Sequence, residues 1–206
     1  MYSLSPNEYK ELEDWVRAYI DRICIVRNTR MPGKRPGTWY TWQFYLRRGL
    51  FNHQFLSAVA QMFFYKMEQE YPGLDYQITG LETGATPMVA GFPLIGRVMG
   101  RDVNAFIVRK HRKEYGLLNI IEGVPDSRPA LIMDDLCNSS SSMAQCYRSL
   151  LDENISVAPV AFSIVNKSNK KIHPELRLRT DMFLPPSIRV LSLFDLDDFN
   201  LSNPSH

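Results

Sequence analysis

The most informative stretch of the chain reads ALIMDDLCNSSSS, from Ala130 to Ser142. Four apolar residues, typical of a short buried strand, lead into two adjacent carboxylates, Asp134 and Asp135. A polar loop follows, and the pattern predicts a helix over residues 141–151. In an open parallel sheet, ligands bind at the carboxyl ends of the strands. The segment therefore indicates both a strand–loop–helix unit and a candidate binding site.

Other segments repeat this alternation. Strands are expected at residues 76–79, 103–108, 130–133, 157–165 and 189–194, and helices at residues 52–70 and from about Pro87. Pro72-Gly73 ends the first of these helices, and Pro93 predicts a kink or a late start in the second. Strands that alternate with helices predict an α/β protein with an open, mostly parallel twisted sheet flanked by helices.

The N-terminal part, residues 1–50, is expected to be a helix and a hood segment attached to a core of residues 51–206. Ser5, Pro6 and Glu8 form a helix start with a capping box. The apolar face of that helix is predicted to contain Tyr9, Leu12, Trp15, Val16, Tyr19 and Ile23. Residues 28–38 hold two prolines, two glycines and three basic side chains, and this composition predicts a loop or turn.

A dense aromatic cluster follows this loop. Its members are Trp39, Tyr40, Trp42, Phe44 and Tyr45. Packing of the N-terminal part, or a dimer contact, is the favoured interpretation. A hood over a flat nucleobase is the alternative.

Composition narrows the function. The 206 residues are 45% hydrophobic with a net charge of +2, which is ordinary for a globular protein and low for a dedicated nucleic-acid binder. No apolar run reaches the roughly 18 residues of a membrane span, and the N-terminus lacks a signal-peptide profile. The three cysteines, Cys24, Cys137 and Cys146, predict no disulfide framework and no metal site. A cytoplasmic location, with no nucleic-acid or membrane partner, is expected.

The polar loop after the acid pair has the chemistry of an anion site. Backbone N–H groups and hydroxyls at a helix N-terminus bind phosphate. Asp134 and Asp135 beside them would bind sugar hydroxyls or Mg²⁺. Together these features predict a site for a phosphorylated sugar. A second interpretation makes the carboxylates a solvated strand end and Asn138 or a serine an ordinary N-cap.

The segment 130–142 resembles the phosphoribosyl pyrophosphate motif of the type I phosphoribosyltransferases, and of the orotate phosphoribosyltransferases in particular. Residues 78–87, ITGLETGATP, resemble the pyrophosphate loop of that family. Residues 106–116, FIVRKHRKEYG, resemble its mobile basic loop, and residues 121–123 resemble the end of that loop. Residues 46–48 resemble its N-terminal part. The similarity covers roughly residues 35–199.

The resemblance implies a fold and an activity. The fold is that of the type I phosphoribosyltransferases, and the reaction is the Mg²⁺-dependent transfer of a phosphoribosyl group from phosphoribosyl pyrophosphate to an orotate-like nucleobase. Asp134, Asp135 and Lys113 are implied as catalytic, with both aspartates near the Mg²⁺ through substrate or water. Binding of the donor is implied for Asn138, Ser139, Ser140, Ser141, Ser142, Glu82, Thr83, Gly84, Ala85, Arg109, Lys110 and Tyr115. Lys113 is expected to act as a lid cation in a neighbouring subunit, which implies a homodimer.

Some positions depart from the family pattern. Ser140 stands where the phosphate loop has a glycine that permits positive φ, and Asn138 stands where threonine is usual. Asn166 and Lys167 replace an Asp-Arg pair whose arginine reads the base carboxylate in the orotate enzymes. Lysine keeps the charge and loses the bidentate fork. Arg35, at a turn that aligns loosely with a substrate-contacting Lys-Ser-Gly, and Lys167 are the expected nucleobase ligands.

These departures leave two alternatives. The first is a phosphoribosyltransferase that takes a different nucleobase. The second is a non-catalytic regulator of the same fold that senses a phosphoribosyl ligand, although the basic loop at residues 109–113 argues against it.

Overall fold

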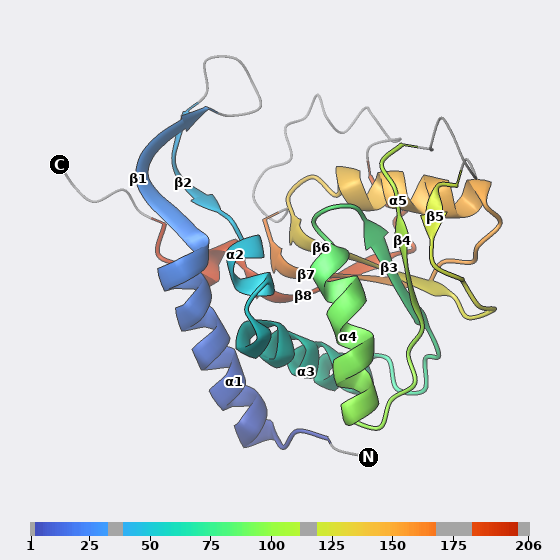
Figure 1. Ribbon diagram of the computed structural model, residues 1–206. Coiled ribbons are helices and arrows are strands. Elements are labelled where there is room, and N and C mark those ends of the chain that lie inside the picture. Colours follow the sequence, from blue (N-terminus) through green and yellow to red (C-terminus); the bar gives the residue numbers. More distant parts are fainter. Residues whose placement is uncertain (1–2, 33–38, 112–118, 168–182, 202–206) are drawn as a thin grey trace.

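The centre of the protein is a six-stranded sheet in the computed structural model, which describes residues 3–32, 39–111, 119–167 and 183–201 (Figure 1). The strand order is β5-β4-β3-β6-β7-β8, and every neighbouring pair is parallel except β4 with β5. This confirms the expected open, mostly parallel sheet. The strands are β3 (Gln77–Leu81), β4 (Ala105–Val108), β5 (Ile121–Glu122), β6 (Ala130–Cys137), β7 (Val160–Asn166) and β8 (Arg189–Asp195).

Helices cover both faces of the sheet. Helices α3 (His53–Glu70) and α4 (Thr86–Val98) lie on one face, and α5 (Ser141–Asp152) lies on the other (Figure 1). Because side chains alternate along a strand, Leu131 and Met133 of β6 join the first core, whereas Ile132 packs with α5. Burial on both faces explains why this strand reads as an unbroken apolar run.

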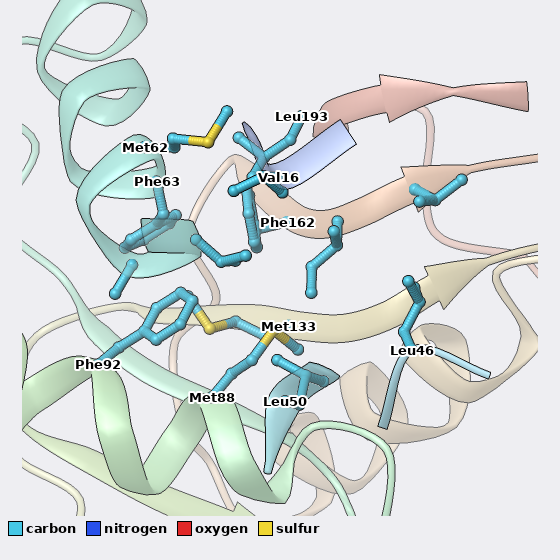
Figure 2. Packing of buried hydrophobic residues seen from close by; sticks show 14 of the residues in the cluster. Val16, Leu46, Leu50, Met62, Phe63, Met88, Phe92, Met133, Phe162 and Leu193 are labelled. Atoms are coloured by element: carbon cyan, nitrogen blue, oxygen red, sulfur yellow. The ribbon is translucent and has the colours of Figure 1, made fainter. Parts of the chain in front are cut away.

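Aromatic side chains form the centre of the larger core. Phe63 of α3 lies between Phe92 of α4 and Phe162 of β7, with ring centroids 5.3 and 4.8 Å away (Figure 2). The expected apolar stripe of α3 is therefore core, as its spacing predicts. Asn52 caps this helix by accepting hydrogen bonds from the N–H groups of Gln54 and Phe55.

The N-terminal part contains more regular structure than the sequence predicts. Helix α1 (Pro6–Tyr19) starts with the expected capping box, in which Ser5 accepts from the Glu8 N–H and the Glu8 carboxylate accepts from the Ser5 N–H. A π-helical turn, η1 (Ile20–Cys24), leads into the hairpin of β1 (Ile25–Pro32) and β2 (Trp39–Phe44).

Four predictions of local structure need correction. The predicted loop from residue 28 is strand as far as Pro32, because pairing with β2 overrides its turn-forming composition. Trp15, predicted on the apolar face of α1, is 40% exposed. Helix α4 begins at Thr86 and continues through Pro93. Strand β6 does not end at Met133, because pairing with β7 extends it to Cys137 and places the acid pair inside the strand.

Two short elements complete the fold, α2 (Arg47–Leu50) and the 3₁₀ turn η4 (Leu196–Asp198). The three cysteines are buried free thiols, which confirms that no disulfide links them. Within the described ranges, no helix combines the length and the hydropathy needed to cross a membrane.

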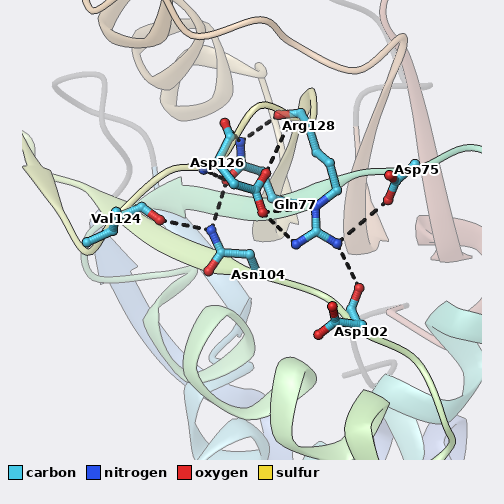
Figure 3. Close-up of polar contacts among 7 residues, drawn as sticks. All are labelled: Asp75, Gln77, Asp102, Asn104, Val124, Asp126 and Arg128. Carbon is cyan, nitrogen blue, oxygen red and sulfur yellow. Dashed lines mark hydrogen bonds and ion pairs between the residues drawn. The ribbon is translucent and has the colours of Figure 1, made fainter.

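A polar network closes the edge of the sheet where β3 and β6 begin (Figure 3). The Gln77 side chain is fully buried, and its amide nitrogen donates to the carbonyls of Asp126 and Arg128 at 2.9 and 2.6 Å. Its oxygen accepts from Asn104 and from the Asp126 N–H. The Arg128 guanidinium holds the pKa of Asp126 below its ordinary value. Internal contacts thus occupy the amino ends of these strands. The carboxyl ends of the strands are the end of the sheet that is open to ligands.

The aromatic core predicts a large effect of truncation. Replacing Phe63 with alanine removes contacts with both helix and sheet, and we expect it to lower the free energy of unfolding by about 3–5 kcal/mol. Val124→Ala is the control, since Val124 is 82% exposed, and it should change stability by less than about 0.5 kcal/mol. Urea denaturation of the two variants measures both values. Equal effects would contradict the assigned core.

Candidate functional site

A cavity of about 500 Å³ lies at the carboxyl ends of β3, β6 and β7, beside the hairpin β1–β2. It brings together most of the candidate residues that the sequence predicts. Those that line it are Glu82, Thr83, Gly84, Lys110, Asp134, Asp135, Asn138, Ser139, Ser140, Ser141, Ser142 and Lys167. The expectation that side chains after separate strands converge at one edge of the sheet is met for these residues.

The acid pair occupies the floor of the cavity. Asp134 and Asp135 are partly buried, and the Asp135 N–H donates to Asp134 Oδ1 at 3.0 Å. Burial, and then the charge of Asp135, raises the pKa of Asp134 well above the ordinary carboxyl value. Burial also raises the pKa of Asp135. A hydrogen bond with Asp134 and the charge of Arg47 act in the opposite direction. Two carboxyl groups whose pKa is raised in this way can hydrogen-bond hydroxyl groups or bind a cation.

Gly84 lets the loop after β3 approach the acid pair. A Cβ atom at this residue would lie 3.0 Å from Asp134 Oδ1 and 3.1 Å from Asp135 Oδ1. Any side chain here would press on both carboxylates, so glycine is required by space. The backbone of this loop therefore borders the same volume as the carboxylates.

The polar loop after β6 has the conformation of an anion cradle. Ser140 has φ 57° and ψ 7°, the left-handed region, and it is the N-cap residue of α5 without a side-chain capping bond. The Ser140 hydroxyl lies 3.3 Å from Cys137 Sγ, and the Ser139 hydroxyl donates to Ser141 at 3.1 Å. The serine thus adopts the backbone conformation that glycine adopts more easily, and the start of α5 faces the cavity.

The two loops that follow β3 and β4 are tied together. The Glu82 carboxylate accepts the Lys110 N–H at 2.9 Å, and the Lys110 carbonyl accepts from Gln145 of α5. Glu82 therefore links loops, while Thr83 and Lys110 line the cavity. Ala85 is fully buried at the start of α4 and lies outside the cavity lining.

Arg109 does not lie with the other predicted site residues at the cavity. Its guanidinium pairs with Glu122 of β5 at 3.2 Å, and Arg109 is absent from the cavity lining. Lys110, the next residue, lines the cavity. Arg35, Lys113 and Tyr115 lie outside the described residues.

Lys167 lines the cavity where β7 ends. Its ammonium lies 4.9 Å from the Trp42 ring centroid and 5.9 Å from that of Phe44. Burial lowers the pKa of Lys167. Tyr40, Trp42, Phe44 and Tyr45 of the aromatic cluster line the cavity. Phe44 and Trp42 also pack in the core, as the packing interpretation predicts.

The sequence reasoning assigned neither Trp42 nor Arg47 to the site by itself, although both line the cavity. Arg47 starts α2, stacks on Tyr45 at 5.2 Å and acts electrostatically on Asp135. The sequence feature that could have indicated Arg47 is the adjacent pair Arg47-Arg48 directly after an aromatic segment. This feature indicates a site only when the structure shows that β2 lines the same cavity as the acid pair.

The relatives found by comparison with known proteins share one name, orotate phosphoribosyltransferase. No family model matches the chain. An orotate phosphoribosyltransferase of Tropheryma whipplei is 34% identical over 89 residues, which are 42% of this chain and 41% of that protein. An orotate phosphoribosyltransferase of Mycobacterium leprae is 29% identical over 156 residues, 74% of this chain and 79% of that protein. The chain thus spans less than half the length of the first relative.

Solved structures share the fold. A Mycobacterium tuberculosis orotate phosphoribosyltransferase in complex with phosphoribosyl pyrophosphate superposes with a TM-score of 0.60 at 18% identity, covering 95% of this chain and 93% of that one. The chain therefore shares the fold of the phosphoribosyltransferases, and part of its sequence is similar to that of orotate phosphoribosyltransferases.

Proposed function

We propose that this protein transfers a phosphoribosyl group from phosphoribosyl pyrophosphate to orotate or a similar nucleobase and releases pyrophosphate. The observation that carries the proposal is the acid pair of β6, which shares one cavity with the left-handed Ser140 and the start of α5. The kinship with orotate phosphoribosyltransferases supports the choice of reaction.

In the proposed reaction the bond from the sugar anomeric carbon to pyrophosphate breaks, and a bond to a nitrogen of the base forms. Asp134 and Asp135 bind the ribose hydroxyls and stabilise the positive charge that develops on the sugar. The loop of residues 138–142 binds the 5′-phosphate. Lys110 and the backbone around Gly84 bind the pyrophosphate, with Lys113 as a lid cation. An acidic base arrives as an anion, so no general base is needed.

The donor set suits Mg²⁺ held jointly with substrate. Asp134 and Asp135 supply carboxylate oxygens, the ligand type that Mg²⁺ prefers. Among the described residues, no group of three or more His, Cys, Asp or Glu side chains comes together as a metal site. The two aspartates would therefore hold the ion through substrate or water. When bound, Mg²⁺ neutralises charge on the departing pyrophosphate.

A different acceptor base is the second candidate function. Asn166 and Lys167 stand where the orotate enzymes have an Asp-Arg pair, and lysine offers a single point charge. A purely sensing role is less favoured, because Ser140 takes the left-handed conformation. Measuring pyrophosphate release with orotate, uracil and a panel of purines separates these candidates. Tight donor binding without release from any base would favour the sensor.

We also propose a homodimer of cytoplasmic subunits, each with a hood part of residues 1–50 on a core of residues 51–206. Leu94 and Val98 of α4 and Phe51 beside α2 are 72%, 86% and 79% exposed. These three residues are our candidates for the subunit contact. In such a dimer, the family resemblance implies that Lys113 of one subunit acts at the site of the other.

Removing a carboxylate should separate activity from stability. Asp134→Asn is expected to lower turnover about 100-fold or more. The folded state holds a proton on Asp134 at a higher pH than the unfolded chain does. The stability linked to this proton is present below about pH 4 and is lost as pH rises through the raised pKa. The variant should therefore be more stable than the wild type at pH 8, with a difference that shrinks toward pH 4.

Denaturant titration of the ligand-free protein between pH 4 and pH 8 measures this difference. Asp152→Asn, at the exposed end of α5, is the matched control and should leave both quantities unchanged. A stability difference that grows toward low pH would contradict the raised pKa.

Ser140 tests the cradle conformation. A residue other than glycine costs roughly 1 kcal/mol in the left-handed region, so Ser140→Gly should keep donor affinity and raise the free energy of unfolding by at most about 1 kcal/mol. Ser140→Val should lower both, because a β-branched residue tolerates positive φ poorly. Calorimetric titration of phosphoribosyl pyrophosphate and urea denaturation provide the measurements. Tighter binding by the valine variant than by the glycine variant would refute the assignment.

The shared site predicts complementation. Lys113→Ala and Asp135→Asn homodimers should each be nearly inactive. After subunit exchange, a mixed dimer has one intact site, so an equimolar mixture should recover about a quarter of wild-type activity. Activity assays before and after mixing make the comparison. No recovery, in a mixture shown by mass to contain mixed dimers, would mean that Lys113 acts within its own subunit.

A further inference from the structure

The peptide groups on both sides of Lys110 are held by side chains from two other parts of the chain. Strand β4 ends at Val108, so Lys110 lies beyond the ladder that β4 forms with β3 and β5. The Lys110 N–H donates to Glu82 Oε1 at 2.9 Å. The Lys110 carbonyl accepts from Gln145 Nε2 of α5, also at 2.9 Å. Two side chains, rather than strand pairing, therefore fix the backbone of a lysine that lines the cavity.

Gln145 belongs to a turn of α5 that is itself firmly held. The neighbouring residues Ala144 and Cys146 are buried, and Cys146 packs in the core between the sheet and α5. The Ala144 N–H donates to the Ser140 carbonyl at 2.8 Å, which joins this turn to the polar loop. Gln145 lies four residues after Ser141, so both residues share one side of the helix. The side of α5 that borders the cavity at Ser141 thus carries Gln145 one turn later.

Gln145 does not line the cavity itself. Among the described residues that do, α5 and the loop before it contribute only residues 138–142. The hydrogen bond to the Lys110 carbonyl is therefore the route by which Gln145 can act on a ligand. A lysine side chain is flexible and offers a point charge, so the position of its ammonium depends on where its backbone is held.

We propose that Gln145 is a positioning residue, which sets the distance between the phosphate loop at the start of α5 and the cation that meets pyrophosphate. The inference rests on the function proposed above, in which one end of the donor binds at residues 138–142 and the other end at Lys110. A pentose with phosphate groups at both ends is the class of ligand that this spacing selects. A single side chain on a rigid helix thus links the two ends of the donor site.

Position matters more here than the strength of the hydrogen bond. The bond between Gln145 and Lys110 is exposed, so water can replace either partner, and the bond adds little to the stability of the fold. A misplacement of about 1 Å in a group that positions substrate can reduce the rate about 100-fold. Glu82 holds only the N–H of Lys110 and leaves its carbonyl to Gln145. Loss of the Gln145 amide is therefore expected to change ligand binding and turnover, and to leave folding intact.

The test compares three ligands by calorimetric titration in the presence of Mg²⁺. They are phosphoribosyl pyrophosphate, pyrophosphate and ribose 5-phosphate. Gln145→Met and Gln145→Ala both remove the donor, and both should bind the two pyrophosphate compounds about tenfold more weakly and ribose 5-phosphate within about twofold of the wild type. Gln69→Met is the matched control, because Gln69 is exposed on α3 and outside the cavity lining. It should match the wild type for all three ligands.

A double-mutant cycle tests the route through Lys110. Lys110→Met removes the cation, so adding Gln145→Met to it should change pyrophosphate affinity by less than about twofold. Additive losses would overturn the inference, because Gln145 would then act independently of Lys110. Urea denaturation of each variant checks its folding.

The choice of ligands separates this inference from the proposed function. Equal pyrophosphate affinity in Gln145→Met and Gln69→Met, in a protein whose wild type transfers to a base, would overturn the inference and leave the proposed function standing. An equal loss for all three ligands would also overturn it, since that result indicates a general disturbance of the site. A selective loss for the two pyrophosphate compounds, in a protein that transfers to no base, would support the positioning role and refute the transferase.

Discussion

A strand that is buried on both faces and carries two adjacent carboxylates near its carboxyl end imposes the main constraint on this protein. β6 needs α3 and α4 on one face and α5 on the other, because its side chains alternate between two cores. Pairing with β7 continues past the apolar run to Cys137, so Asp134 and Asp135 lie inside the strand, near its carboxyl end. Burial there raises the pKa of both groups. Carboxyl groups whose pKa is raised by burial inside a cavity are typical of functional sites.

The surrounding loops are arranged around that pair. Gly84 is the residue that lets the loop after β3 reach the carboxylates, since a Cβ atom would meet both. Ser140 takes a left-handed conformation so that α5 can start beside them. Glu82 ties the loops after β3 and β4 together through the Lys110 N–H. At the other edge, Gln77 satisfies the backbone groups of the segment before β6. Hydrogen bonds within the protein thus concentrate at the amino ends of the strands. An open cavity with charged groups lies at their carboxyl ends.

The N-terminal hairpin changes the character of this cavity. Without β2, the carboxyl edge of the sheet would be a polar and open surface. With it, Tyr40 and Trp42 give the cavity an apolar wall, and Lys167 is partly desolvated against that wall. Donor chemistry and acceptor chemistry therefore come from different parts of the chain. The sheet and α5 supply the residues suited to a phosphorylated sugar, and the hairpin supplies those suited to a flat ring. Such a division lets acceptor preference vary while the donor site is kept.

The amino-acid sequence by itself determined the alternation of strands and helices, the capping box at Ser5, the apolar stripe of α3 and the acid pair with its serine loop. These features depend on local periodicity and on the chemistry of neighbouring residues. Only the tertiary structure decided that residues 25–32 form a strand, that β6 runs on to Cys137, and that Arg109 pairs with Glu122 away from the cavity. It also decided that Trp42 meets Lys167 across more than a hundred residues of chain. Pairing between distant strands and the direction of a side chain depend on neighbours in space, and a linear pattern does not specify those neighbours.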